Sequence, residues 1–286
     1  MDSVTNSEKS RRATLMALSA LALWSSVAAL ALKLRFVPPF LLVGVSLTLG
    51  ALVGARGLKF RGLKPGVLLL GVYGLFTYHL CLFTALRLAP PVETNLLNYL
   101  WPLLIVLLSP LIIRGSVLRP RHVLGAVLGF AGAALLVAGS GRLGFPAGAL
   151  PGYALAVAGA AIWSTYSLLT KRFGGFPTST VSVFCLISGI LSLLCHFAFE
   201  PRYTPTLAEA PYILFMGLGP MGASFYLWDR ALKDGDPRVI GTLAYLTPLF
   251  STALIAALGE GKLTLSSAVA GALIIGGAAI GTFSGR

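Results

Sequence analysis

The sequence predicts an all-α polytopic membrane protein with ten transmembrane helices in two inverted five-helix repeats around a central cavity. Three observations lead to this fold class. The 286 residues are 56% hydrophobic and 11% charged, with a mean hydropathy of +0.86, well above the roughly 45–50% apolar content of soluble domains. Apolar runs follow one another along the chain, separated by short basic or Pro/Gly-rich connectors. The second half also repeats motifs of the first.

Each apolar run is long enough to cross a hydrocarbon core of about 30 Å as a helix, which takes about 20 residues. Little of the chain is left over for a soluble domain. The expected helices are 13–32, 37–56, 65–88, 92–112, 121–140, 148–170, 178–198, 209–232, 237–258 and 264–283.

The basic residues predict how the chain is oriented. The net charge is +13, but the basic side chains are scattered over the connectors, so nucleic acid is not an expected partner. With a cytoplasmic N-terminus, sixteen of the 22 Lys and Arg residues lie inside and six outside. The positive-inside rule therefore predicts that both termini are cytoplasmic.

The first apolar run and the cysteines do not indicate a secreted protein. The run that follows SEKSRR is longer than the apolar core of a signal peptide, so we expect it to remain as the first transmembrane helix. Cys81, Cys185 and Cys195 are odd in number and fall inside apolar runs. We expect them to pack as apolar side chains rather than to form disulfides.

Matched motifs indicate an internal duplication. LNYLWPLL at 97–104 and LAYLTPLF at 243–250 share a Tyr-Leu-x-Pro-Leu core. ALWSS at 22–26 has a counterpart in AIWST at 161–165. The matches keep the same order in both halves, which predicts two homologous repeats.

The duplication divides the chain into a first repeat at 1–142, an extracytoplasmic linker at 143–147 and a second repeat at 148–286. Each repeat has an odd number of expected helices, so the second must cross the membrane in the opposite sense. Two inverted halves can form two arrangements of similar energy, one open to each side, which is what alternating access requires. The alternative is that duplication only builds a stable bundle.

Pro102 and Pro248 lie near the middle of two matched helices. Each lacks an N–H group and leaves the carbonyl four residues earlier without its helical partner. In a membrane such a carbonyl is satisfied by neighbouring helices, side chains or water in a cavity. We expect both prolines to act as hinges, although simple kinks in packed helices would give the same pattern.

Polar and aromatic side chains at mid-membrane depth are the candidate ligand contacts. Residues that differ between the repeats are favoured, because a ligand does not share the pseudo-symmetry of the protein. His79 is matched by Phe225, and Trp101 by Thr247. An ionisable group such as His79 at this depth also indicates function by default, although each of these side chains could instead be packed core. The expected binding residues are His79, Trp101, Tyr78, Asn98, Tyr99, Trp163 and Tyr245.

Motifs of common enzymes are not found in the sequence. It has no Walker sequence, no HExxH, no metal-spaced His/Cys cluster and no G-x-S-x-G elbow. The carboxylates fall at or near helix ends, so none is an obvious proton carrier at the centre. An intramembrane enzyme or a scaffold is therefore the less favoured class, and no metal or cofactor is expected.

These features together resemble the drug/metabolite transporter superfamily in its EamA-type branch. The resemblance rests on the two Trp-Ser pairs, the two Tyr-Leu-x-Pro-Leu motifs and LGEGKLT after the ninth helix, and it covers nearly the whole chain. LNYLWP and AIWSTYSLLTKRF are similar to the YddG-type aromatic amino-acid exporters. One departure is Arg114, at a position where halves of this family often have an acidic residue, as Glu260 provides in the second half.

The resemblance implies a secondary transporter of the bacterial cytoplasmic membrane that exports aromatic, and also other neutral, amino acids by alternating access. A broad-specificity drug or metabolite exporter of the same fold is the alternative. The expected partners are an amino-acid substrate and the lipid bilayer, and a monomer is consistent with the sequence. Aromatic faces could stack a substrate ring, while Asn98 and His79 could meet its charged groups.

Overall fold

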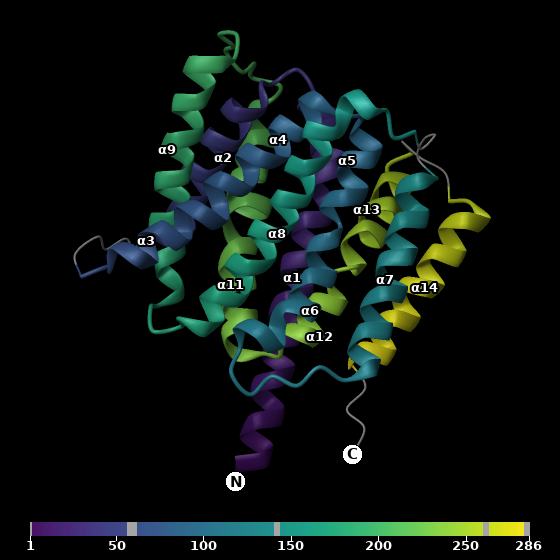
Figure 1. Ribbon diagram of the computed structural model, residues 1–286. Coiled ribbons are helices and arrows are strands. Elements are labelled where there is room, and N and C mark those ends of the chain that lie inside the picture. The colour runs from purple at the N-terminus through teal and green to yellow at the C-terminus, as the bar shows by residue number, and fades with distance from the viewer. Residues whose placement is uncertain (1, 56–61, 140–143, 260–262, 283–286) are drawn as a thin grey trace.

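The computed structural model is a helical bundle (Figure 1). It describes residues 2–55, 62–139, 144–259 and 263–282, and no strand occurs within these ranges. Glu260 and the first residue of the expected linker, at 143, lie outside the described residues. Helix α1 (Asp2–Lys33) begins at the same end of the bundle at which α14 (Leu265–Thr282) ends.

The helices follow one another with short connections, and two of them are π-helical (η2 and η5) and two 3₁₀-helical (η3 and η4). Between α1 and α14 the described elements are α2 Pro39–Val53, α3 Pro65–Gly71, η2 Val72–Thr77, α4 Tyr78–Leu88, α5 Pro91–Asn98, α6 Leu100–Ile112, α7 Pro120–Ala138, η3 Ala147–Ala149, α8 Leu150–Arg172, η4 Thr178–Thr180, α9 Val181–Phe199, α10 Ala210–Leu218, η5 Gly219–Ala223, α11 Ser224–Asp234, α12 Pro237–Leu243 and α13 Leu246–Ala257.

Eight helical stretches of the described chain are long and apolar enough to cross a membrane: Glu8–Lys33, Pro65–Leu88, Pro91–Ile112, Pro120–Ala138, Ala147–Arg172, Thr178–Phe199, Pro237–Ala257 and Leu265–Thr282. Helix α2 is also apolar but shorter. The expected helix at 209–232 corresponds to α10, η5 and α11, which are not among the eight. Its last turns carry several charged residues, Asp229 and Arg230 among them, which lower the hydropathy of this stretch.

Proline marks where many of these helices begin. Pro39, Pro65, Pro91, Pro120 and Pro237 each lie in the first turn of their helix. A first-turn residue has no helical acceptor for its N–H group, so proline loses nothing there, and its fixed φ suits the helix. The positions of these prolines in the sequence therefore predict where several helices begin.

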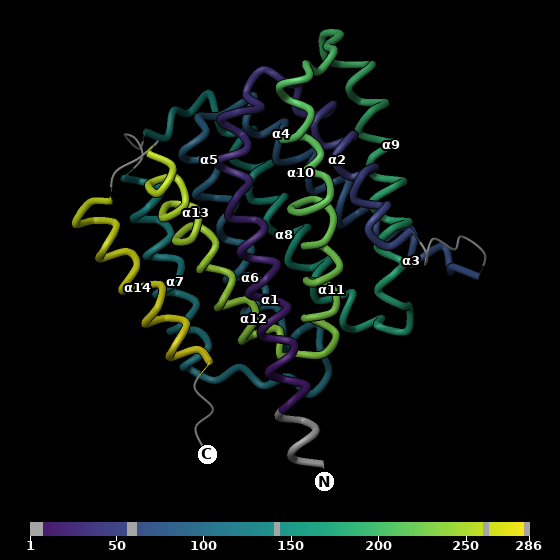
Figure 2. The backbone as a smooth tube through the Cα atoms, turned by 180° about the vertical axis from the view of Figure 1, so that it is seen from behind, coloured from purple at the N-terminus to yellow at the C-terminus, as the bar shows by residue number. Residues whose placement is uncertain are grey.

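Glycine allows two pairs of helices to approach closely. Helices α7 and α14 lie side by side in Figures 1 and 2. A methyl group on Gly125 of α7 would lie 2.6 Å from the carbonyl oxygen of Gly277 in α14. Helices α2 and α9 pack in the same way, and a methyl group on Gly189 would lie 2.9 Å from the carbonyl oxygen of Gly44. Small residues at such contacts are typical of membrane helix pairs.

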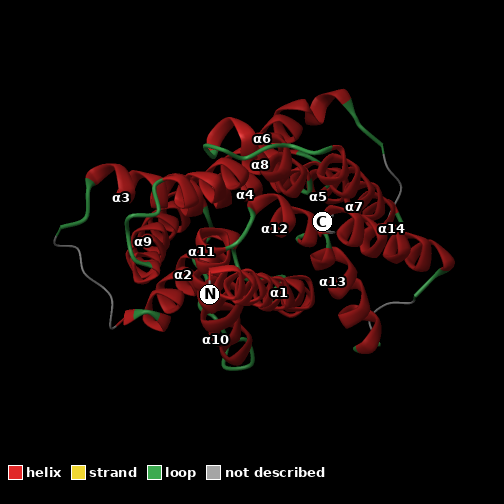
Figure 3. Cartoon of the chain, turned by 90° about the horizontal axis from the view of Figure 1, so that it is seen from below, coloured by secondary structure: helices red, strands yellow, loops and turns green. Residues whose placement is uncertain are grey.

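The two tight pairs flank a central group of helices. In Figure 3, α9 lies near one edge of the molecule and α7 and α14 near the opposite edge, with α1, α11 and α12 between them. The main hydrophobic core lies among these central helices together with α6 and α8, and it extends to α2 and α9. The central helices therefore position the candidate site.

Four of the central stretches are not regular α-helices along their whole length. A π-helical turn, η2, precedes α4, and a second one, η5, precedes α11. The helix expected at 92–112 is interrupted at Tyr99, and the helix expected at 237–258 at Ala244 and Tyr245. Each interruption lies about one turn before the proline, Pro102 or Pro248, in the matched motif.

Candidate functional site

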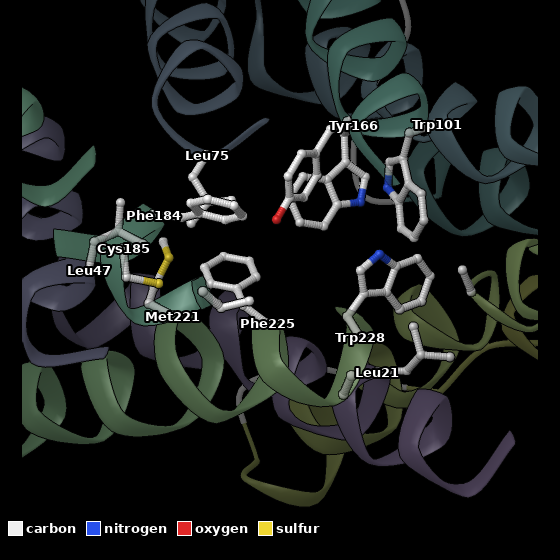
Figure 4. Packing of buried hydrophobic residues seen from close by; sticks show 14 of the residues in the cluster. Leu21, Leu47, Leu75, Trp101, Tyr166, Phe184, Cys185, Met221, Phe225 and Trp228 are labelled. Atoms are coloured by element: carbon white, nitrogen blue, oxygen red, sulfur yellow. The ribbon is translucent and has the colours of Figure 1, made fainter. Parts of the chain in front are cut away.

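The four tryptophans of the chain converge at the centre of the bundle. Trp24 comes from α1, Trp101 from α6, Trp163 from α8 and Trp228 from α11. The closest pair is Trp24 and Trp228, whose ring centroids are 5.1 Å apart, and Trp101 lies 5.6 Å from Trp228. Trp101, Trp228 and the neighbouring Tyr166 face a shared centre in Figure 4. We call the four tryptophan side chains the tryptophan cluster.

The rings of the tryptophan cluster mostly meet edge to face. Trp101 is inclined by 87° to Trp163 and by 83° to Trp228, and Trp24 by 76° to Trp163. This geometry places the positive edge of one ring against the negative face of the next. Trp101, Trp163 and Trp228 are buried, and Trp24 is half-buried. The cluster thus presents aromatic faces in a largely dry environment.

The ring N–H groups divide the cluster into two kinds of tryptophan. Trp24 Nε1 donates to the carbonyl oxygen of Pro220 in η5, at 3.0 Å, and Trp228 Nε1 donates to Ser167 Oγ, at 3.1 Å. Within the described residues, no hydrogen bond holds the ring N–H of Trp101 or Trp163. Trp24 and Trp228 are therefore anchored to the protein, whereas Trp101 and Trp163 keep a free donor.

Tyr78 and His79 extend the aromatic surface from α4. The Tyr78 ring lies 5.2 Å from Trp163, and the His79 ring 6.4 Å from Phe225. His79 is 4% exposed, and its Nδ1 lies 2.5 Å from the Leu75 carbonyl oxygen. With Nδ1 as the donor, Nε2 of a neutral imidazole remains available as an acceptor.

Two buried polar side chains near the helix interruptions have unpartnered oxygens. Asn98 donates from Nδ2 to the Tyr78 hydroxyl at 3.3 Å, but its Oδ1 has no partner within the described residues. The Thr247 hydroxyl also has none there. Both residues are 9% exposed. A buried polar atom without a partner is rare and indicates a ligand, water or strain.

Tyr99 and Tyr245 hold matched positions but lie in different surroundings. Tyr99 is half-buried at the interruption between α5 and α6. Tyr245 is completely buried and packs on α7, where a methyl group on Gly129 would lie 2.4 Å from its Cδ2 atom. Tyr245 belongs to a hydrophobic cluster with Val106 and Ile274 that is separate from the main core. The structure thus does not bring Tyr245 into the tryptophan cluster.

Sequence reasoning missed some residues of this site. Trp228 and Phe225 belong to it, and Thr247 carries an unpartnered hydroxyl near it, yet none was among the expected binding residues. Trp228 is matched in the first half by Leu82. Trp101 and His79 were chosen because their matched residues are of a different type. The same criterion would also have identified Trp228.

These features define a class: a multi-pass helical membrane protein whose central helices enclose an aromatic, neutral-polar site. The chain belongs to the EamA-like transporter family, whose model matches residues 11–138 and, separately, residues 150–283. It is accordingly a transporter and not an enzyme.

Proteins of known name are similar to the chain over nearly its full length. It is 44% identical to the aromatic amino acid exporter YddG of Ancylobacter novellus, over 96% of this chain and 98% of the relative. It is 26% identical to the YddG of Escherichia coli K12, over 93% of this chain and 95% of that protein. A crystal structure with 42% sequence identity superposes with a TM-score of 0.91 and covers 96% of this chain and 98% of its own.

Proposed function

We propose that the protein exports aromatic and other neutral amino acids across the bacterial cytoplasmic membrane by alternating access. The observation that carries this proposal is the tryptophan cluster, to which α1 and α6 of the first half and α8 and α11 of the second half each contribute one ring. An aromatic substrate can replace one ring-to-ring contact with its own ring. Each such contact contributes about 0.5–1.5 kcal/mol beyond the burial of apolar area.

The unpartnered polar atoms account for the other end of an amino acid. Asn98 Oδ1 can accept a hydrogen bond from an ammonium group, and the Thr247 hydroxyl can donate to a carboxylate. His79 Nε2 is a second acceptor on the first half. A ligand with a charged end would thus satisfy groups that are otherwise buried at a cost. The named relatives, which are aromatic amino acid exporters, support the same substrate class.

We further propose the ten-helix, two-repeat organisation, with repeats 1–142 and 148–286. The family model supports it by matching once in each half. Helix contacts also support it. When each helix is replaced by its counterpart in the other half, one observed contact becomes another observed contact. Helix α1 packs on α11 as α8 packs on α4, and α6 packs on α8 as α13 packs on α1. In the pairs α2 with α9 and α7 with α14, the two helices are counterparts of each other, so the replacement leaves these contacts unchanged.

The sidedness of this topology can be tested with single cysteines. On a background in which the native cysteines are replaced by alanine, Ala208→Cys lies in the exposed connection before α10, and Val117→Cys in the exposed connection before α7. The proposed topology places position 208 outside and position 117 inside. An impermeant maleimide added to intact cells should therefore label only the first. Labelling of both, or only of Val117→Cys, would refute the inverted arrangement.

The substrate class can be tested with purified protein in liposomes. Counterflow is measured with tryptophan, phenylalanine, threonine and a cationic dye, and empty liposomes provide the background. We expect phenylalanine and tryptophan to exchange fastest, threonine more slowly, and the dye not at all. Transport of the dye together with loss of the preference for amino acids would favour a broad-specificity drug exporter instead.

A further inference from the structure

The two repeats predict two equivalent helix interfaces, one for each half. Only one of them is formed in the described part of the structure. Helix α6 packs against α12, where a methyl group on Gly241 would lie 3.1 Å from the carbonyl oxygen of Pro102. Exchange of the two halves turns this pair into α13 and α5. Within the described residues these two helices have no extensive contact: α13 packs on α1, α7 and α14, and α5 on α4, α6, α7 and α8.

The side chain of Asn95 marks the open interface. It occupies the position in α5 that corresponds to Gly241 in α12, and it is exposed. A polar amide is unfavourable against lipid but favourable in a water-filled space. In the proposed topology α5 and α13 lie toward the outside, so the bundle is closed on the cytoplasmic side and open on the extracytoplasmic side.

The hydroxyl of Tyr245 contacts the backbone at the interruption between α5 and α6. It accepts from the N–H of Leu103 at 3.1 Å and donates to the carbonyl oxygen of Tyr99 at 3.2 Å. Tyr99 is the N-cap of α6, so this N–H and this carbonyl belong to the first turn of that helix, directly after the interruption. A tyrosine of the second half thus holds the helix interruption of the first half in place.

The repeat partner of this residue makes no equivalent contact. Tyr99 is half-buried, and its hydroxyl has no hydrogen bond within the described part of the chain. The backbone groups that correspond to its partners in the other half are the N–H of Leu249 and the carbonyl of Tyr245. The tyrosine contact is therefore as asymmetric as the helix interface.

We propose that Tyr245 is a positioning residue for transport, whose hydroxyl stabilises the outward-open arrangement by fixing the interruption at Tyr99, and that Tyr99 takes the reciprocal role at Tyr245 in the inward-open arrangement. This inference rests on the proposed inverted repeats. Trp101 lies two residues beyond the interruption, so the contact also sets how this ring enters the tryptophan cluster. The two tyrosines alternate: Tyr245 is released from the Tyr99 backbone when α5 and α13 pack together, and Tyr99 is released from the Tyr245 backbone when α6 and α12 pack together.

The test measures how often the bundle is open to the outside. Asn95→Cys is introduced on the cysteine-free background, and its labelling rate with an impermeant maleimide is followed in intact cells without added substrate. A single net hydrogen bond changes a two-state ratio by about three- to tenfold. Tyr245→Phe should therefore lower the ratio of open to closed protein by this factor and slow labelling by up to the same factor. Tyr99→Phe, added to Tyr245→Phe, should bring the rate back toward that of the parent.

Two controls distinguish the tyrosine contact from a wrong topology and from a general loss of stability. Tyr226→Phe removes the hydroxyl of a half-buried tyrosine, which bonds Ser182 at 2.9 Å and the Gly50 carbonyl at 3.2 Å, and it should leave labelling unchanged. Ala208→Cys reports the topology alone, so its failure to label would count against the proposed repeats and not against the tyrosine pair. Unchanged labelling in Tyr245→Phe, or a further decrease in the double variant, would overturn the inference. A merely destabilised protein would show no recovery in the double variant.

Discussion

The segment α5–α6 of the first half and the segment α12–α13 of the second half share the Tyr-Leu-x-Pro-Leu motif but differ in the side chains around it. The first half has Asn98 and Trp101 where the second has Ala244 and Thr247. Both segments are interrupted at the shared tyrosine, yet only the first contributes a ring to the tryptophan cluster. Within these two segments, shared residues thus build the helix interruption, whereas unshared residues contribute to the site.

The largest effect should come from a scaffold position outside these two segments, at the contact between α7 and α14. Gly277→Ala places a methyl group 2.6 Å from the Gly125 carbonyl oxygen, so the contact between α7 and α14 must open. Overpacking of this kind costs about 1–3 kcal/mol. We expect a lower thermal unfolding temperature in detergent and unchanged substrate preference.

The adjacent residue gives a matched control for this scaffold prediction. A methyl group on Gly276 would meet no atom within 4 Å. Gly276→Ala should therefore leave the unfolding temperature unchanged or raise it slightly. Equal loss of stability in both variants would contradict the assigned contact with α7, because alanine has the higher helix propensity and should not destabilise the open position at Gly276.

The next effect should come from an unshared site position. Trp101→Ala removes a ring with three tryptophan neighbours and should reduce phenylalanine and tryptophan counterflow by about tenfold or more. Threonine and alanine should be affected less. Thr247→Ala, at the matched position, should weaken all amino acids alike. If Thr247→Ala were as selective for aromatic substrates as Trp101→Ala, the distinction between the halves would fail.

A smaller effect is expected at His79, whose matched residue is Phe225. His79→Ala should reduce counterflow of every amino acid by about fivefold, because one hydrogen bond to the substrate, worth about 1 kcal/mol, is lost. Phe225→Ala should reduce aromatic substrates preferentially. If His79 instead carries protons, His79→Gln will remove the pH dependence of accumulation between pH 6 and pH 8 and spare counterflow.

The smallest effect concerns the starts of the two matched segments. Helix α12 begins after Asp236, whose carboxylate accepts the Arg238 N–H at 2.9 Å, whereas α5 begins after Pro90, which has no such side chain. Burial alone would raise the pKa of Asp236, but the hydrogen bonds from the side chain and backbone of Arg238 outweigh it, and the pKa lies below its usual value. Asp236→Asn should lower the unfolding temperature by about 1–3 °C near pH 7.

The pH dependence of this difference follows from the depressed pKa. The stabilising contribution of Asp236 is present above the usual aspartate pKa of about 3.9 and is lost as the pH falls through the lower pKa of the folded protein. The gap between wild type and Asp236→Asn should therefore narrow on acidification toward pH 3. A gap that widens would contradict the assigned contacts.

The sequence predicted most helices because their signals are local. Long apolar runs indicated where the eight spanning stretches lie, and first-turn prolines such as Pro39 and Pro120 indicated where helices begin. The prolines also indicated that helices 92–112 and 237–258 would be irregular. They did not reveal that the interruptions lie at Tyr99 and Tyr245, because the hydroxyl contact that accompanies the first one comes from a residue far away in the chain.

The site was only partly predictable, because helical periodicity does not hold across a π-helical turn. An inserted π-turn rotates the following residues relative to the preceding ones. Trp228 follows η5, so the face to which it belongs cannot be read from the regular spacing of 209–232. Tyr78 and His79 directly follow η2, and both adjacent side chains contact rings of the site.

The tryptophan cluster has a consequence for spectroscopy. Every indole of the protein belongs to it, so the intrinsic indole fluorescence comes from one place. Rings separated by 5.1 to 6.5 Å exchange excitation energy readily. Indole emission therefore reports the packing of these four rings together and carries no tryptophan background from elsewhere in the chain. Phenylalanine, which is almost dark at indole wavelengths, can be titrated against this signal without any attached dye.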